Sequence, residues 1–200
     1  MVRIALTGGI ATGKSVVARE LHAEGIATID ADVLARAVVR PGSAGLAAVV
    51  TRFGPGVVAP DGSLDRSALA RVVFADAAAR RDLEGLLHPL VRQGIDAFVG
   101  ALPRGVLGVA EVPLLYETGW VRTFDVAVVT ACCAATQHAR LVARDGLSVV
   151  AADQRLAAQW PIEDKARLAD AVVMTEGSLD ETRAQARRLA AWLRGRSRLS

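Results

Sequence analysis

Apolar runs and helical spacings alternate at the start of the chain. Residues 2–7 form a short apolar run that is typical of a buried strand, and two glycines follow it. Residues 14–24 carry apolar side chains at helical spacing, and residues 26–29 form a second apolar run. The order strand, glycine loop, helix and strand predicts a βαβ unit, which implies a parallel sheet.

The middle of the chain reads as mostly helical. Turns rich in proline and glycine separate its helical patterns, which lie at 33–39, 43–53, 66–74 and 77–101. A stretch of this length exceeds a simple crossover between two strands of one sheet. The pattern therefore predicts a helical lobe that is inserted into the α/β core.

The remaining pattern returns to alternating strands and helices. Further strands are expected at 106–112, 124–130 and 171–174. Further helices are expected at 135–145 and 149–159, and a capping box at 178–181 opens a last helix that should end near Arg194.

The composition is that of a globular chain. Of its 200 residues, 52% are hydrophobic and 22% are charged, which provides ample material for a core. No apolar run approaches the ~20 residues of a membrane helix. The N-terminal residues pass straight into glycines without the apolar stretch of a secretory signal. We therefore expect a soluble, cytoplasmic protein with no membrane partner.

The two cysteines, Cys132 and Cys133, are neighbours in the chain. Adjacent residues rarely satisfy disulfide geometry, and the pair offers too few ligands for a metal ion. We expect two small apolar residues at the end of a buried strand.

The charge balance is mildly basic, with a net charge of +3 and a pI near 9.4. Lys14 and Lys165 are the only lysines, so almost every strong cation is an arginine, which suits phosphate or nucleic acid. A nucleic-acid-binding ATPase is one interpretation. The aromatic fraction of 4% provides few stacking platforms for single strands, so we expect no nucleic-acid partner.

The glycine loop after the first strand matches G-x-x-x-x-G-K-[ST], the pattern of a loop that binds nucleotide phosphates. Its residues are Gly8, Gly9, Ile10, Ala11, Thr12, Gly13, Lys14 and Ser15. Tight glycine turns and a helix N-terminus direct backbone N–H groups at phosphate oxygens. Lys14 would reach the β- and γ-phosphates of ATP, and the Ser15 hydroxyl would bind Mg²⁺. The chain contains no asparagine, which excludes the usual guanine-reading motif of a GTPase.

Candidates for the acceptor side lie at strand ends. Asp30 and Asp32 close the second strand, at the edge of the sheet where α/β proteins bind ligands. One carboxylate would accept the proton of an attacking hydroxyl and the other would cap the next helix, and Asp30 is the better candidate for the cap. Glu111 ends a buried strand, where it would either hold the Mg²⁺ shell through water or pair with an arginine.

Two arginines of the following helix are candidates for phosphate contacts. Arg140 and Arg144 are four residues apart and so share one helix face. Arginines on a lid neutralise the charge of a transferring phosphoryl group while they exclude water. A solvated helix face is the alternative.

Taken together, these residues resemble the dephospho-CoA kinase family, which catalyses the last step of coenzyme A synthesis. The likeness runs from Leu6 to about Ser178. It rests on the segments 6–10, 29–32, 61–66, 87–92 and 112–117, and on Gln137, Arg140, Arg144, Arg155, Gln159 and Asp170.

The resemblance implies a single P-loop kinase domain, a three-layer α/β sandwich with a five-stranded parallel sheet. The core would comprise about 1–32, 104–133 and 168–195, a helical lobe at about 33–103 would bind dephospho-CoA, and a lid would span about 134–160. ATP and Mg²⁺ are the implied cofactors, and the protein is expected to be a monomer or a weak homo-oligomer.

The resemblance also assigns roles to single residues. Asp32 would activate the 3′-hydroxyl of the dephospho-CoA ribose, Lys14 and Arg140 would stabilise the transferring phosphoryl group, and Arg144 would bind the nucleotide. His88-Pro89 would either contact substrate or start a helix. A kinase of another nucleoside or nucleotide is the alternative function, against which the long helical insert argues.

Three positions depart from the family pattern. Ala11-Thr12 stands where Gly-Ser is common, and alanine disfavours a positive φ. Thr175-Glu176 stands where an asparagine usually lies near the adenine, so the adenine contacts must be made otherwise. Glu111 stands where aspartate is frequent, which keeps the carboxylate but changes its reach.

Overall fold

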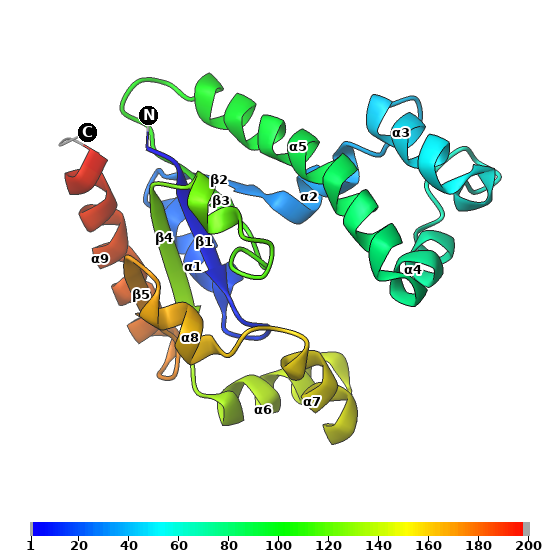
Figure 1. Cartoon of the computed structure of the whole chain (residues 1–200). Coiled ribbons are helices and arrows are strands. Elements are labelled where there is room, and N and C mark those ends of the chain that lie inside the picture. The colour runs from blue at the N-terminus through cyan, green and yellow to red at the C-terminus, as the bar shows by residue number, and fades with distance from the viewer. Residues whose placement is uncertain (1, 198–200) are drawn as a thin grey trace. The chain divides into compact units, whose positions relative to one another are not determined.

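Five parallel strands form one sheet in the order β2-β3-β1-β4-β5 (Figure 1). The computed structural model describes residues 2–197. The strands are β1 (Ile4–Gly8), β2 (Ala27–Asp30), β3 (Gly108–Glu111), β4 (Val126–Ala131) and β5 (Ala171–Met174). All five strands were expected from the apolar runs, and the parallel α/β architecture is confirmed.

Helices cover both faces of this sheet, as the fully buried strands β1 and β4 require. Behind the sheet in Figure 1, α1 (Lys14–Ala23) lies near α9 (Leu179–Ser197), and α8 (Ile162–Arg167) lies in front and packs against β4. Apolar residues of α1 and α9 share one core with the strands, for example Leu21 and Leu193 with Leu6. The three-layer arrangement is therefore present.

Two more helices and one short turn complete this part of the chain. α6 (Ala134–Asp145) and α7 (Val149–Ala157) follow β4, and a 3₁₀ turn occupies Trp120–Thr123. The patterns predicted α6 and α7 but missed α8, because six residues after Pro161 are too short to show a helical period. α9 continues to Ser197, three residues beyond the expected end.

The capping box at the start of α9 is confirmed. Ser178 Oγ accepts the Glu181 N–H at 3.2 Å, and Glu181 Oε2 accepts the Ser178 N–H at 2.7 Å. At the free edge of the sheet, Gln185 of the same helix binds both main-chain polar groups of Met174. Its Oε1 accepts the N–H at 3.0 Å and its Nε2 donates to the carbonyl at 2.7 Å.

A buried ion pair joins the loop after β3 to α8. Lys165 Nζ is fully buried and lies 2.5 Å from Glu117 Oε1, which also accepts the Trp160 N–H at 3.0 Å. The rings of Tyr116 and Trp160 stack with their centroids 6.3 Å apart. The buried positive charge of Lys165 is therefore neutralised by the carboxylate of Glu117.

Residues Asp30–Phe98 form a compact unit of their own, and residues up to Ile29 together with those from Val99 onward form the other. The Asp30–Phe98 unit contains α2 (Ala31–Ala37), α3 (Ala44–Phe53), α4 (Arg66–Ala75), most of α5 (Ala77–Ala101) and a 3₁₀ turn at Pro55–Val57. All four helices were expected. Its core is formed by Val39, Leu46, Val49, Val57 and Leu69.

The suggestion that His88-Pro89 starts a helix is wrong, because Pro89 lies inside the 25 residues of α5. The helix begins after Asp76, whose carboxylate accepts the Ala78 N–H at 2.7 Å. Proline in a helix interior removes one i→i−4 hydrogen bond. In α5 the remaining hydrogen bonds on both sides of Pro89 keep the helix continuous.

The prediction for the cysteines is confirmed for Cys132 and wrong for Cys133. Cys132 is buried directly after β4, and desolvation raises the pKa of its thiol. Cys133 is exposed, because the chain leaves the sheet there and turns into α6. Within residues 2–197, no helix combines the length and apolar character needed to cross a membrane.

Candidate active site

The phosphate loop, residues 8–15, connects β1 to α1. Gly8 is the last residue of β1, and Lys14 and Ser15 begin α1. Gly13 precedes the helix with φ 81°, a left-handed conformation in which a side chain would be strained. The loop therefore turns sharply into a helix N-terminus, the geometry that favours an anion.

The side chain of Thr12 supports the phosphate loop through hydrogen bonds. Thr12 is buried, and its Oγ1 donates to the Gly9 carbonyl at 2.8 Å. The same oxygen lies 2.8 Å from Thr130 Oγ1 of β4. These bonds engage the Thr12 hydroxyl within the protein and tie the loop to β4.

Ala11 adopts φ 59°, the only positive φ of a non-glycine residue in the described part of the chain. The cost of this conformation for an L-residue is about 1–2 kcal/mol. The strain expected where the family commonly has glycine is therefore present.

Lys14 and Glu111 meet beside the loop. Lys14 Nζ lies 2.8 Å from Glu111 Oε2, and the two side chains are 19% and 14% exposed. Adjacent parallel strands account for the meeting, because Glu111 of β3 is in register with Leu6 of β1, which leads into the loop. The pairing of Glu111 with an arginine was a wrong alternative, since its cation is Lys14.

The oxygen donors near the loop suit Mg²⁺. The Ser15 hydroxyl is exposed at the start of α1, and the Glu111 carboxylate ends the neighbouring strand. No group of three or more His, Cys, Asp or Glu in residues 2–197 could hold a metal by itself. Mg²⁺ commonly takes one or two protein oxygens together with substrate phosphates and water, so these residues fit the ion.

Arg140 of α6 is fixed by a residue that the sequence patterns did not single out as a contact. Its Nη2 donates to the Thr175 carbonyl at 2.6 Å and its Nη1 to Thr175 Oγ1 at 3.3 Å. Thr175 is 3% exposed, and its hydroxyl donates to the Thr12 carbonyl at 2.7 Å. One buried hydroxyl thus links the guanidinium of Arg140 to the phosphate loop.

Arg144 pairs with its neighbour Asp145 instead of Thr175. Its Nε lies 2.7 Å from Asp145 Oδ1, and Arg155 of α7 lies 2.9 Å from Asp145 Oδ2. The hydrogen bond from Arg144 lowers the pKa of Asp145, and the charge of Arg155 adds to the effect. The helix carrying both arginines was correctly predicted, but only Arg140 is linked to the loop in this structure.

The two aspartates after β2 have different partners. Asp30 is the N-cap of α2, and its Oδ1 accepts the Asp32 N–H at 2.7 Å. The capping role expected of Asp30 is therefore confirmed. The Asp32 side chain is exposed in the first turn of α2, within the Asp30–Phe98 unit, and its carboxylate has no ion-pair or hydrogen-bond partner among residues 2–197.

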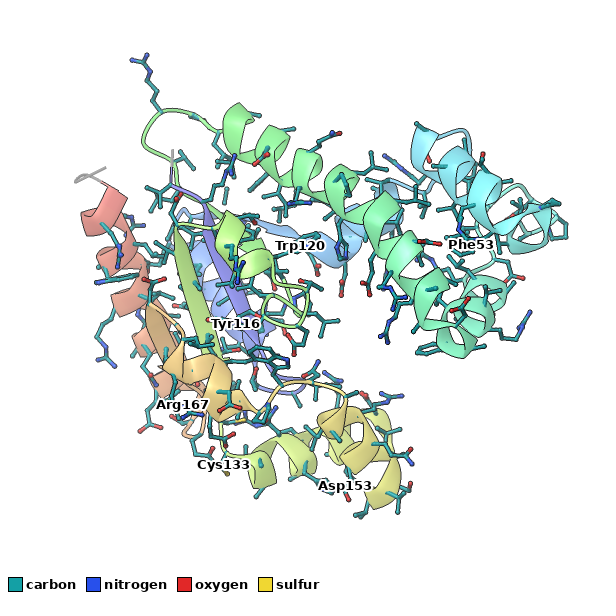
Figure 2. The ribbon with its side chains drawn as sticks, viewed as in Figure 1. Phe53, Tyr116, Trp120, Cys133, Asp153 and Arg167 are labelled. Atoms are coloured by element: carbon teal, nitrogen blue, oxygen red, sulfur yellow. The ribbon has the colours of Figure 1, made fainter. Side chains whose placement is uncertain are left out.

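Glu176 follows Thr175 and holds the start of α6. Its carboxylate accepts the Cys133 N–H at 2.8 Å and is hydrogen-bonded by the Thr136 hydroxyl. These bonds, that of Thr136 first, lower the pKa of Glu176. Figure 2 shows Cys133 where the chain enters α6, and Asp153 in α7 beyond it. Thr175 therefore supports the phosphate loop, and Glu176 supports the start of α6.

Comparison with known proteins identifies the family. The family model for dephospho-CoA kinase matches residues 2–181. A dephospho-CoA kinase of Symbiobacterium thermophilum is 50% identical over 94% of this chain and 79% of that protein. A dephospho-CoA kinase of Anaeromyxobacter dehalogenans is 47% identical over 96% of this chain and 92% of that protein.

Solved structures agree on the fold. A Thermus thermophilus protein of known crystal structure has a TM-score of 0.81 and 34% identity, with 95% of this chain and 97% of that chain covered. A dephospho-CoA kinase from Campylobacter jejuni has a TM-score of 0.71 at 24% identity, with 98% of each chain covered, and this likeness shows the fold. Because the family model matches residues 2–181 and a named relative is 50% identical, the chain belongs to the dephospho-CoA kinase family.

Proposed function

We propose that this protein transfers the γ-phosphoryl group of ATP to the 3′-hydroxyl of dephospho-CoA, which yields coenzyme A and ADP. The match of residues 2–181 to the dephospho-CoA kinase family carries this proposal. The phosphate loop between β1 and α1 supports it, because that geometry binds the terminal phosphates of a nucleotide.

The residues near the loop have distinct tasks in this reaction. Main-chain N–H groups of residues 8–15 would bind phosphate oxygens, and Lys14 would neutralise the β- and γ-phosphates. Arg140 would stabilise the charge on the transferring phosphoryl group, supported from behind by Thr175. Arg144 would reach the nucleotide only after its bond to Asp145 opens.

Mg²⁺ is the second part of the proposal. Ser15 would ligate the ion and Glu111 would hold its water shell. When bound, the ion supplies charge neutralisation across the β- and γ-phosphates. Lys14, released from Glu111, would then face the phosphates.

Asp32 is proposed as the base that accepts the proton of the 3′-hydroxyl. Its exposed carboxylate has no competing partner among residues 2–197, whereas Asp30 is engaged as a cap. The helices at about 33–103 would hold the CoA-like part of the substrate, and the segment at about 134–160 would act as a lid that excludes water. We propose a cytoplasmic enzyme, since its phosphoryl donor is ATP.

A coupled assay for ADP tests the function directly. Purified protein with Mg²⁺ and ATP should release ADP with dephospho-CoA, and far more slowly with adenosine or AMP. Product analysis should place the new phosphate on the 3′-oxygen. Faster turnover with adenosine or AMP would support the alternative, a P-loop kinase of another nucleoside or nucleotide.

A further inference from the structure

Two glutamines bind both main-chain polar groups of one phosphate-loop residue, Ile10. Gln137 Nε2 donates to the Ile10 carbonyl at 2.8 Å, and Gln159 Oε1 accepts the Ile10 N–H at 2.7 Å. Gln137 lies in the first turns of α6, and Gln159 lies two residues beyond the end of α7. Two segments that are distant from Ile10 in sequence therefore converge on a single loop residue.

The chemistry of this contact is directional. A carbonyl only accepts and an N–H only donates, so Gln137 must present its amide nitrogen and Gln159 its amide oxygen. Gln137 is 5% exposed, so a lost bond would leave a buried polar group without a partner. A Cβ on Gly9 would lie 2.4 Å from Gln137 Nε2, which shows how closely the glutamine packs on the loop.

The contact also bears on Arg140, which follows Gln137 by one helical turn. Because Gln137 ties α6 to the loop, it helps to fix the position of the Arg140 guanidinium relative to the loop. Gln159 ties the returning chain after α7 to the same residue. Both ends of the α6–α7 segment are thereby anchored to the element that binds phosphate.

We propose that Gln137 and Gln159 are positioning residues that fix the phosphate loop and couple it to the α6–α7 segment. The proposal rests on the proposed function only in taking the loop as the ATP site. Neither glutamine need touch a reacting atom, because each acts through a main-chain group of Ile10.

A matched pair of substitutions tests this polarity. Gln137→Glu and Gln159→Glu add the same charge in nearly the same shape. Gln159→Glu keeps an acceptor for the Ile10 N–H, whereas Gln137→Glu sets a carboxylate oxygen against the Ile10 carbonyl. MgATP binding by calorimetry, without any phosphoryl acceptor, should therefore be about tenfold weaker in Gln137→Glu than in Gln159→Glu. Equal affinities in the two variants would overturn the proposal.

A second measurement keeps the test decisive if Gln137→Glu does not fold. Gln159→Met removes the acceptor without adding charge, and amide hydrogen exchange at Ile10 should then accelerate about tenfold or more while Gln159→Glu stays close to the parent protein. In turnover assays, Gln159→Met should raise KM for ATP more than it lowers kcat. Unchanged exchange at Ile10 in Gln159→Met would also overturn the proposal.

These measurements are separable from the identity of the substrate. MgATP binding and Ile10 exchange following the expected order would support the anchoring role even if dephospho-CoA were not phosphorylated. Efficient phosphorylation of dephospho-CoA by Gln137→Glu and Gln159→Met, both with parental MgATP affinity, would leave the function intact and refute the anchoring role.

Discussion

The ammonium group of Lys14 and the carboxylate of Glu111 form an ion pair of 2.8 Å between the first turn of α1 and the end of β3. Lys14, which we expect to bind phosphate, is thus paired with Glu111, which we expect to hold the water shell of Mg²⁺. Binding of MgATP would separate the two groups and give each a new partner of opposite charge.

Glu111→Gln should raise the Mg²⁺ concentration required for half-maximal activity by about tenfold or more, because the amide no longer carries the charge that holds the hydrated ion. Glu111→Asp, which keeps the carboxylate, should lie much closer to the parent enzyme. Titrating activity with Mg²⁺ at saturating ATP measures the effect. A parental Mg²⁺ requirement in Glu111→Gln would reduce Glu111 to a partner of Lys14.

Asp32→Asn should lower kcat by about 10²–10⁴-fold, the range typical of a lost general base. The melting temperature should change little, because the Asp32 side chain is exposed and has no partner among residues 2–197. Asp30→Asn is the matched control, since asparagine caps helices as well as aspartate and should preserve turnover. If Asp30→Asn lost as much activity as Asp32→Asn, the division of roles between the two aspartates would be wrong.

Lys165→Met should destabilise the protein by about 3–5 kcal/mol, because Glu117 would be left as a buried charge without its cation. Adding Glu117→Gln to Lys165→Met should recover part of the loss, as the buried charge is then removed. Denaturant unfolding of the parent, single and double variants measures both steps. Equal stability of parent and Lys165→Met would show that the pair is not desolvated in solution.

Ala11→Gly should raise the free energy of unfolding by up to about 1 kcal/mol, because glycine adopts φ 59° without strain but loses more conformational entropy on folding. Ala11→Val should lower it, since a β-branched side chain is least tolerated at positive φ. Thermal unfolding of the three proteins gives the order. A lower melting temperature for Ala11→Gly than for Ala11→Val would contradict the assigned strain.

His88 should contribute to acid sensitivity. Burial lowers its pKa, which the charge of Arg92 also lowers and that of Glu84 raises. The unfolded chain therefore binds this proton more readily, and stability is lost as the pH falls below about 6.5, the ordinary histidine pKa. His88→Gln should make the decline in stability between about pH 7 and pH 5 shallower. The slope of unfolding free energy against pH is the quantity to compare, and an unchanged slope would exclude this contribution.

The sequence patterns predicted the elements well because buried parallel strands are nearly continuous apolar runs, as in β1 and β4. They also predicted the glycine turn between β1 and α1, because its signal lies in consecutive residues. Asp30 as a cap followed from local rules as well. Short α8 gave no period to detect, and the exposure of Cys133 depended on where the chain leaves the sheet.

The site contacts were less accessible to sequence reasoning. The bonds from Arg140 to Thr175 and from Gln137 to Ile10 join residues that are far apart in the chain. No spacing rule encodes such contacts. Gln137 and Gln159 belong to the residues that carry the family likeness, but nothing in the sequence indicates that they share Ile10 as a partner. Helix spacing likewise did not indicate that Arg144 pairs with Asp145.

Gln185 has a consequence at the outermost strand. An edge strand exposes unpaired main-chain groups, with which a strand of another molecule can pair, and such pairing commonly leads to aggregation. By occupying both the N–H and the carbonyl of Met174, this glutamine imitates the strand that is missing there. A foreign segment approaching the end of β5 would have to displace it first, so the protein carries its own protection against unwanted self-association at that point.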